Sequence, residues 1–175
     1  MADRTNDEGA RSWDTVNVRS RGYCIAHTLG SCPNCGGKTR VVALALPAGH
    51  ETLSLADTEP EGPDLECWDT AASGAFLFYI GYLPDEVRHR VQAVVRAYRW
   101  TLSADTHGSY WANHCEHCDA LLEDHELFCE PEGAFMPASA AGAAAIALTR
   151  VDEPFAANAA GYAHEPQFLE FTIRM

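Results

Sequence analysis

Apolar residues recur along this chain with the spacing of helices in one region and of strands in others. The helical spacing predicts one main helix from Pro84 to Tyr98. Its apolar positions are spaced i, i+4, i+7, i+8 and i+11, which places them on one face of a helix. Pro84 suits the first turn, and Asp85 and Glu86 complement the positive end of the helix dipole. The stripe consists of Val87, Val91, Val94, Val95 and Tyr98.

Shorter runs rich in valine, leucine and aromatic residues predict β-strands. The run from Phe76 to Tyr82 is apolar enough to be a central strand covered on both faces. Residues 57–66 are rich in proline and acid and predict a surface loop, while the alanine-rich residues 138–147 are compatible with helix or buried strand. The other predicted strands are 23–26, 39–46, 52–56 and 168–173.

These elements predict an α+β fold in which an antiparallel sheet packs against one main helix. The 175 residues are enough for one domain with a core of its own. Residues 1–20 contain few apolar anchors, and we expect them to be a partly flexible N-terminal tail. Residues 21–175 are then a single globular domain.

Acidic residues outnumber basic ones, 25 against 12, which gives a formal net charge of −13. That sign disfavours nucleic-acid binding, because phosphate contacts depend on lysine and arginine. The first residues lack the apolar core of a secretory signal, and no apolar run can span a bilayer, so we expect a cytoplasmic protein without a membrane segment. In that reducing compartment seven cysteines would rarely persist as disulfides, which favours metal binding.

Four of the cysteines form two Cys-x-x-Cys pairs, Cys32 with Cys35 and Cys115 with Cys118. Random placement of seven cysteines would give only about 0.3 pairs at this spacing. Strand-like residues flank each pair, so each predicts a hairpin whose turn aims two sulfur atoms at one point. Four thiolates are the ligand set of a structural zinc site, and the sequence predicts one structural Zn²⁺ held by all four.

The segment Cys32-Pro33-Asn34-Cys35-Gly36-Gly37 resembles the knuckle of zinc-ribbon proteins, in which glycine after the second cysteine permits a positive φ. The second turn is similar but has Asp119 at that position, and aspartate tolerates this conformation better than most residues. The resemblance implies two zinc-knuckle hairpins. Because 79 residues separate Cys35 from Cys115, the fold would be a zinc ribbon with a long insertion, and zinc binding would be coupled to folding of the whole domain.

The segment from Tyr110 to Ala120 also resembles a stretch of uncharacterised bacterial proteins that contain two such cysteine pairs. That resemblance implies the same four ligands and a packing role for Tyr110 and Asn113, but no activity. One alternative to the shared site is two zinc ions, each bound by residues close together in the sequence. The other alternative is that no metal is bound. The side chains available for local sites are Cys24, His27, His125 and Cys129.

The sequence favours a non-catalytic zinc-binding protein that acts as a protein–protein interaction module, with an acidic surface for a basic partner. It contains no phosphate loop, GxSxG elbow or HExxH helix, and no catalytic residue is assigned. One alternative is an enzyme whose active site lies away from the zinc. Such an active site could use Asp124, His125 and Glu126, the only titratable residues that crowd together beside the second turn. A solvent-exposed acidic loop also explains this cluster. The other alternative is a thiol redox protein that uses Cys32 and Cys35.

Overall fold

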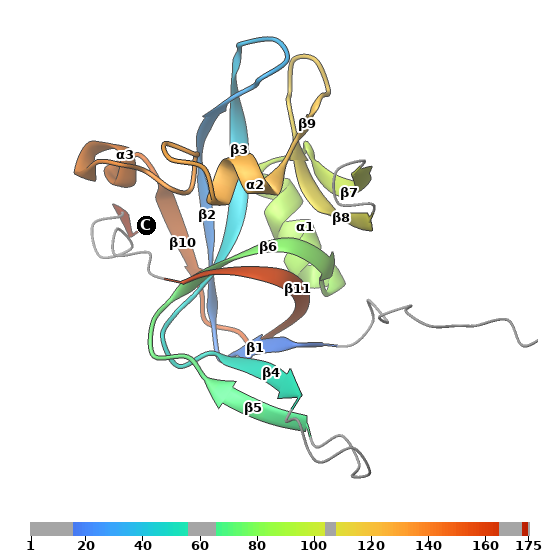
Figure 1. Ribbon diagram of the computed structural model, residues 1–175, viewed down its shortest axis with the longest axis vertical. Helices are drawn as coiled ribbons and strands as arrows, with labels where there is room; N and C mark the ends of the chain where they lie inside the picture. Colours follow the sequence, from blue (N-terminus) through green and yellow to red (C-terminus); the bar gives the residue numbers. More distant parts are fainter. Residues whose placement is uncertain (1–15, 56–65, 104–107, 165–172, 175) are drawn as a thin grey trace, which may run out of the picture.

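The computed structural model describes residues 16–55, 66–103, 108–164 and 173–174 (Figure 1). Most of the predicted tail, nearly all of the predicted loop at 57–66 and most of the predicted strand at 168–173 therefore lie outside the described residues. The last residues of the predicted tail, Val18–Ser20, form a strand. No helix in the described part of the chain is long and apolar enough to cross a membrane.

The described residues form mainly β-strands, with three short helices: α1 (Asp85–Val94), α2 (Asp124–Phe128) and α3 (Ala140–Ala144). The strands are β1 (Val18–Ser20), β2 (Tyr23–Ser31), β3 (Lys38–Leu46), β4 (Glu51–Leu55), β5 (Glu66–Thr70), β6 (Ala75–Tyr82), β7 (Tyr98–Ser103), β8 (Gly108–His114), β9 (Leu121–Leu122), β10 (Ala147–Val151), β11 (Phe155–His164) and β12 (Ile173–Arg174). The predictions of strands at 23–26, 39–46 and 76–82 are confirmed.

The strands form one extensive sheet in the order β12-β10-β2-β3-β6-β11-β1-β4-β5. Strand β8 also pairs with β6, and both β7 and β9 pair with β8. Among the described strands, all pairings are antiparallel except that of β10 with β12. The β2–β3 hairpin and the β8–β9 hairpin extend side by side from one end of the molecule (Figure 1).

The predicted α+β fold with one main helix and two zinc-knuckle hairpins is wrong, because the chain is mostly antiparallel sheet and closer to all-β. The predicted helix stops at Val94, and Val95 is extended, with φ −132° and ψ 103°. Tyr98 then begins β7 and pairs with Asn113 of β8. Valine and tyrosine favour strands, so the energy of sheet pairing outweighs the helical spacing in this segment.

Apolar side chains are buried on both faces of the central strands. Along β3, Val42 and Leu44 belong to the core beneath α1, whereas Val41 and Ala43 belong to the core beneath α2. The alternation follows from the two-residue period of a strand. Two cores therefore hold β3 rigidly on both sides, and β3 begins just after the first cysteine pair.

Candidate metal centre

The first cysteine pair lies in the tight turn that joins β2 to β3. The Gly36 N–H donates to the Cys32 carbonyl at 2.9 Å, and the Cys32 N–H donates to the Gly37 carbonyl at the same distance. Gly36 has φ 71°, as expected for glycine after the second cysteine. The turn is a local structure that the sequence of residues 32–37 specifies.

The second pair lies between β8 and β9 in a turn with the same hydrogen bonds. The Asp119 N–H donates to the Cys115 carbonyl at 3.0 Å, and the Cys115 N–H donates to the Ala120 carbonyl at 2.9 Å. Asp119 has φ 64°, so it occupies the left-handed conformation that glycine adopts in the first turn. Arg99 binds its carboxylate at 2.6 Å.

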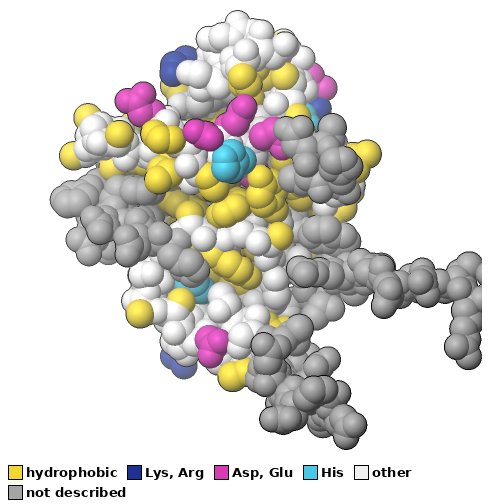
Figure 2. Space-filling model, viewed as in Figure 1, with side chains coloured by type: hydrophobic (Ala, Val, Ile, Leu, Met, Phe, Trp, Pro, Cys, Tyr) yellow, Lys and Arg dark blue, Asp and Glu magenta, His cyan; other side chains and the backbone are white. Residues whose placement is uncertain are grey.

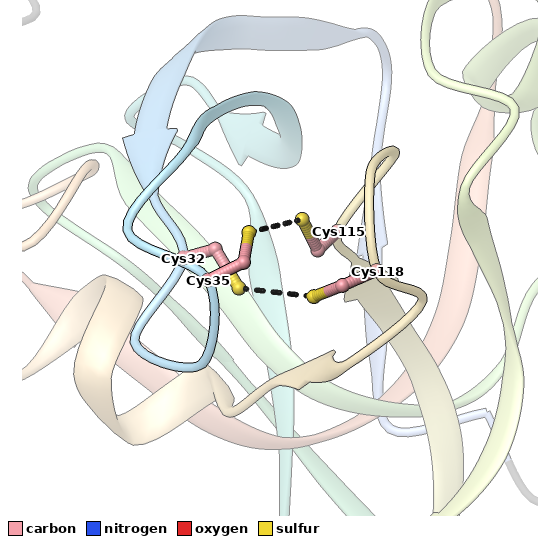
Figure 3. A group of neighbouring side chains, drawn as sticks. All are labelled: Cys32, Cys35, Cys115 and Cys118. Atoms are coloured by element: carbon pink, nitrogen blue, oxygen red, sulfur yellow. Dashed lines mark hydrogen bonds between the residues drawn. The ribbon is translucent and has the colours of Figure 1, made fainter.

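The two turns bring all four sulfur atoms within 4.8 Å of one another, although the pairs are 79 residues apart (Figure 3). The Sγ atoms of Cys32 and Cys118 are 3.6 Å apart, and those of Cys35 and Cys115 are 3.7 Å apart. A zinc ion with Zn–S bonds of about 2.3 Å separates tetrahedral sulfur ligands by about 3.8 Å. The spacing therefore fits one tetrahedral metal ion, and none of the four cysteines is in a disulfide.

The residues considered for local sites do not form a second centre. Within the described ranges, no other group of three or more histidine, cysteine or acidic side chains has its ligand atoms gathered around one point. His125 instead contacts the carboxylate of Glu130 at 3.1 Å.

Hydrogen-bond donors surround the sulfur atoms. Asn34 Nδ2 donates to Cys118 Sγ at 3.4 Å, and the His117 N–H donates to Cys115 Sγ at the same distance. Such donors stabilise thiolates and fix their orientation toward a metal. Asn34 crosses from the first turn to a sulfur of the second, so it also links the two turns.

The thiols do not ionise equally. The pKa of Cys118 is lowered to about 6, first by the hydrogen bond from Asn34 and then by the N–H of Ala120. The Gly37 N–H lowers the pKa of Cys35, but hydrogen bonding with the other thiols and burial outweigh it and raise that pKa to about 11. Four clustered thiols cannot all lose their protons without a counter-charge, and a divalent cation supplies that charge.

Asn113 is the side chain that positions the second turn beside the first. It is buried, its Oδ1 accepts from the Val42 N–H at 2.9 Å, and its Nδ2 donates to the Val42 carbonyl at 2.9 Å. The side-chain amide of Asn113 thus bonds to the Val42 backbone as a neighbouring strand would, and it joins β8 to β3. The Glu116 N–H adds a second link by donating to Thr39 Oγ1 at 2.9 Å.

The titratable residues after the second turn, Asp124, His125 and Glu126, do not gather around one point. Asp124 is buried and accepts the Tyr79 N–H at 2.6 Å. Burial raises its pKa to about 7, with a further upward contribution from Glu123, while the Tyr79 hydrogen bond opposes both. His125 and Glu126 are exposed, so they do not share an environment with Asp124.

Comparison with protein-family profiles, with curated proteins and with solved structures finds no match for this chain. The chemistry of the centre therefore rests on its own residues. Four sulfur atoms at the spacing of a tetrahedral site can hold one metal ion, and the donor set selects among metals. Thiolates favour zinc, copper(I) and iron over magnesium or calcium.

Proposed function

We propose that the chain is a non-catalytic module in which one structural zinc ion clamps two hairpins, and that the module binds another protein. Cys32, Cys35, Cys115 and Cys118 are the ligands. The observation that carries the proposal is the convergence of these four sulfur atoms within 4.8 Å. Zinc fits better than iron or copper because a tetrahedral shell of four thiolates is its usual structural site.

A structural role follows from the ligand set. Four thiolates fill the tetrahedral shell and leave no position for water or substrate, whereas catalytic zinc keeps one position open. Cys32 and Cys115 are each only 1% exposed, which shields the ion from one side. The ion joins chain segments about 80 residues apart, so its binding energy stabilises the tertiary fold directly.

The surface near the second turn also supports a non-catalytic role. A hollow of about 600 Å³ is lined by Arg96, Ala97 and residues 115–119. Both acidic side chains in this lining are in ion pairs: Glu116 with Arg40 and Asp119 with Arg99. No described carboxylate in this hollow is left poised to act as a general base.

Metal analysis of the purified 175-residue chain tests the proposal. We expect one zinc per chain by plasma mass spectrometry, and sulfur-only coordination at about 2.3 Å by X-ray absorption. Cys32→Ser and Cys118→Ser should each lose zinc and unfold at lower denaturant concentration. Cys67→Ser is the matched control, because Cys67 is exposed and lies outside the cluster, and it should keep its zinc.

The outcomes separate the alternatives. Two zinc ions per chain, with loss of one in Cys129→Ser, would replace the shared site with local sites. Purified protein without any metal that shows full stability would refute the proposal. Reversible dithiol oxidation of Cys32 and Cys35 in a zinc-loaded protein would favour the thiol redox alternative.

A further inference from the structure

A groove of about 250 Å³ lies beside the first cysteine turn, between the end of β2 and the segment that follows α2. Its apolar lining comes from Leu29, Leu122, Leu127 and Ala134. Leu29 is aliphatic, yet the residue is 60% exposed. Leu29 therefore gives the groove an exposed apolar edge.

The wall formed by residues 130–135 is rigid. The Phe135 N–H donates to the Leu127 carbonyl at 2.9 Å, and the Phe135 ring stacks on Phe128 with centroids 5.0 Å apart. Gly133 fits so closely that a Cβ there would lie 2.5 Å from the Glu126 carbonyl oxygen. The groove is therefore preformed, and a ligand would not have to order it.

The other wall contains a strand edge. Strand β10 pairs with β2 only from Tyr23 to His27, and Leu29, Gly30 and Ser31 lie beyond that pairing. In the part of the chain that the structure describes, β3 is the only strand that pairs with these three residues. An unpaired strand edge accepts an extended peptide through backbone hydrogen bonds.

The charge of the groove selects the kind of peptide. Glu126, Glu130 and Glu132 line it, and Lys38 is the only cationic side chain among the described residues that line it. Figure 2 shows acidic side chains gathered on this face above the apolar band. Glu126 and Glu132 form no ion pair with other described residues, so their charges are available to a ligand. A second copy of the chain is disfavoured, since each copy has a net charge of −13.

We propose that this groove binds an extended segment of another protein in which an aliphatic side chain is flanked by lysine or arginine. The aliphatic group packs between Leu29 and Ala134, the basic groups meet the glutamates, and the backbone pairs with residues 29–31. This inference deepens the partner-binding part of the proposed function by naming the surface and the chemistry of the partner.

Fluorescence anisotropy with the 175-residue chain tests this inference. The probe is a short fluorescein-labelled peptide in which lysine alternates with leucine, and the comparison peptides replace leucine with serine or lysine with glutamate. We expect the lysine–leucine peptide to bind at least about tenfold more tightly than either comparison peptide. Raising the ionic strength should weaken binding without abolishing it, because the apolar contact is not screened.

Matched variants locate the site. The triple variant Glu126→Gln, Glu130→Gln, Glu132→Gln should weaken binding at least about tenfold. A control triple variant removes the same charge from exposed positions elsewhere and should leave affinity within about twofold. Leu29→Asn, at an exposed position, should weaken binding while leaving the circular dichroism and zinc content unchanged. The control substitutions are Asp69→Asn, Glu86→Gln and Glu153→Gln.

Several results would overturn the inference: equal affinity for the lysine–serine peptide, equal losses in the two triple variants, or no binding at peptide concentrations up to about 1 mM. Self-association that Leu29→Asn abolishes would assign the groove to a second copy instead. Zinc content is measured separately, so absence of zinc with intact peptide binding would refute the structural-metal proposal alone. Zinc binding without peptide binding would refute only the groove.

Discussion

Replacing Asp124 by asparagine should change how the stability of this protein depends on pH. The carboxyl group is buried, and its hydrogen bond from the Tyr79 N–H does not compensate for lost hydration. Its pKa is therefore raised to about 7, whereas an unfolded chain gives the ordinary value of 3.8. Asparagine is nearly isosteric, its Oδ1 can accept the same hydrogen bond, and it carries no charge to desolvate.

The direction follows from proton linkage. Below about pH 4 the carboxyl group is protonated in both states, so it has no effect on the pH dependence. From about pH 4 to pH 7 the unfolded state is ionised while the folded state keeps its proton, and the free energy of unfolding falls as pH rises. A shift of about 3 pKa units corresponds to about 4 kcal/mol over the whole range, of which about 2 kcal/mol falls between pH 5.5 and 7.

Equilibrium denaturation by urea at several pH values from 5.5 to 8.5 measures the effect, with zinc present throughout. The quantity of interest is the stability of Asp124→Asn minus that of the wild type, because acid effects on the cysteine site then cancel. This difference should rise by about 2 kcal/mol up to pH 7 and stay constant above it. The tyrosines near Asp124 do not contribute, since burial raises the pKa values of Tyr79, Tyr98 and Tyr110.

Asp152→Asn is the matched control, because this carboxylate is exposed and pairs with Arg150. Its stability difference from the wild type should not change over the same pH range. A flat difference for Asp124→Asn, or one that falls as pH rises, would mean that Asp124 is already ionised in the folded protein. The reasoning from burial would then be refuted.

Three other substitutions test individual side-chain contacts. Asn113→Ala leaves the buried N–H and carbonyl of Val42 without their side-chain partner. It should lower the free energy of unfolding in urea by about 2–4 kcal/mol and weaken zinc binding in a chelator competition. Gly161→Ala places a Cβ 2.1 Å from the Phe78 ring. It should lower the free energy of unfolding by about 1–3 kcal/mol and lower Tm with it. An unchanged Tm would show that the ring moves freely. Arg40→Ala breaks only an exposed ion pair, so its denaturation curve should overlay that of the wild type.

Local patterns in the sequence were sufficient for β2, β3 and β6 and for each cysteine turn, but not for β1, β7 or β11. The alternation of residues 39–46 and the apolar run at 76–82 specify strands because a strand has a two-residue period. A turn of six residues forms from its own hydrogen bonds, which is why Asp119 could be expected to take the conformation of Gly36. Four cysteines in two such turns also identified the candidate ligands.

The predicted helix is present but ends at Val94 instead of Tyr98, because valine and tyrosine also favour strands. Where propensity favours neither helix nor strand, the neighbouring chain segment decides, and β8 pairs with this segment as a strand. The sequence alone contains no information about this pairing. The same limit applies to the fold class, since most of the sheet depends on pairings between distant strands.

The sequence by itself determined where some of the strands form, how each cysteine turn folds and which four thiols are candidates for a metal. Only the tertiary structure decided that the two turns meet, that Asp124 is buried and that a groove with glutamates lies beside the first turn. The physical reason is range: periodicity and turn chemistry act over a few residues. Sulfur atoms on segments about 80 residues apart come together only when strand register and packing on both faces of the sheet are satisfied.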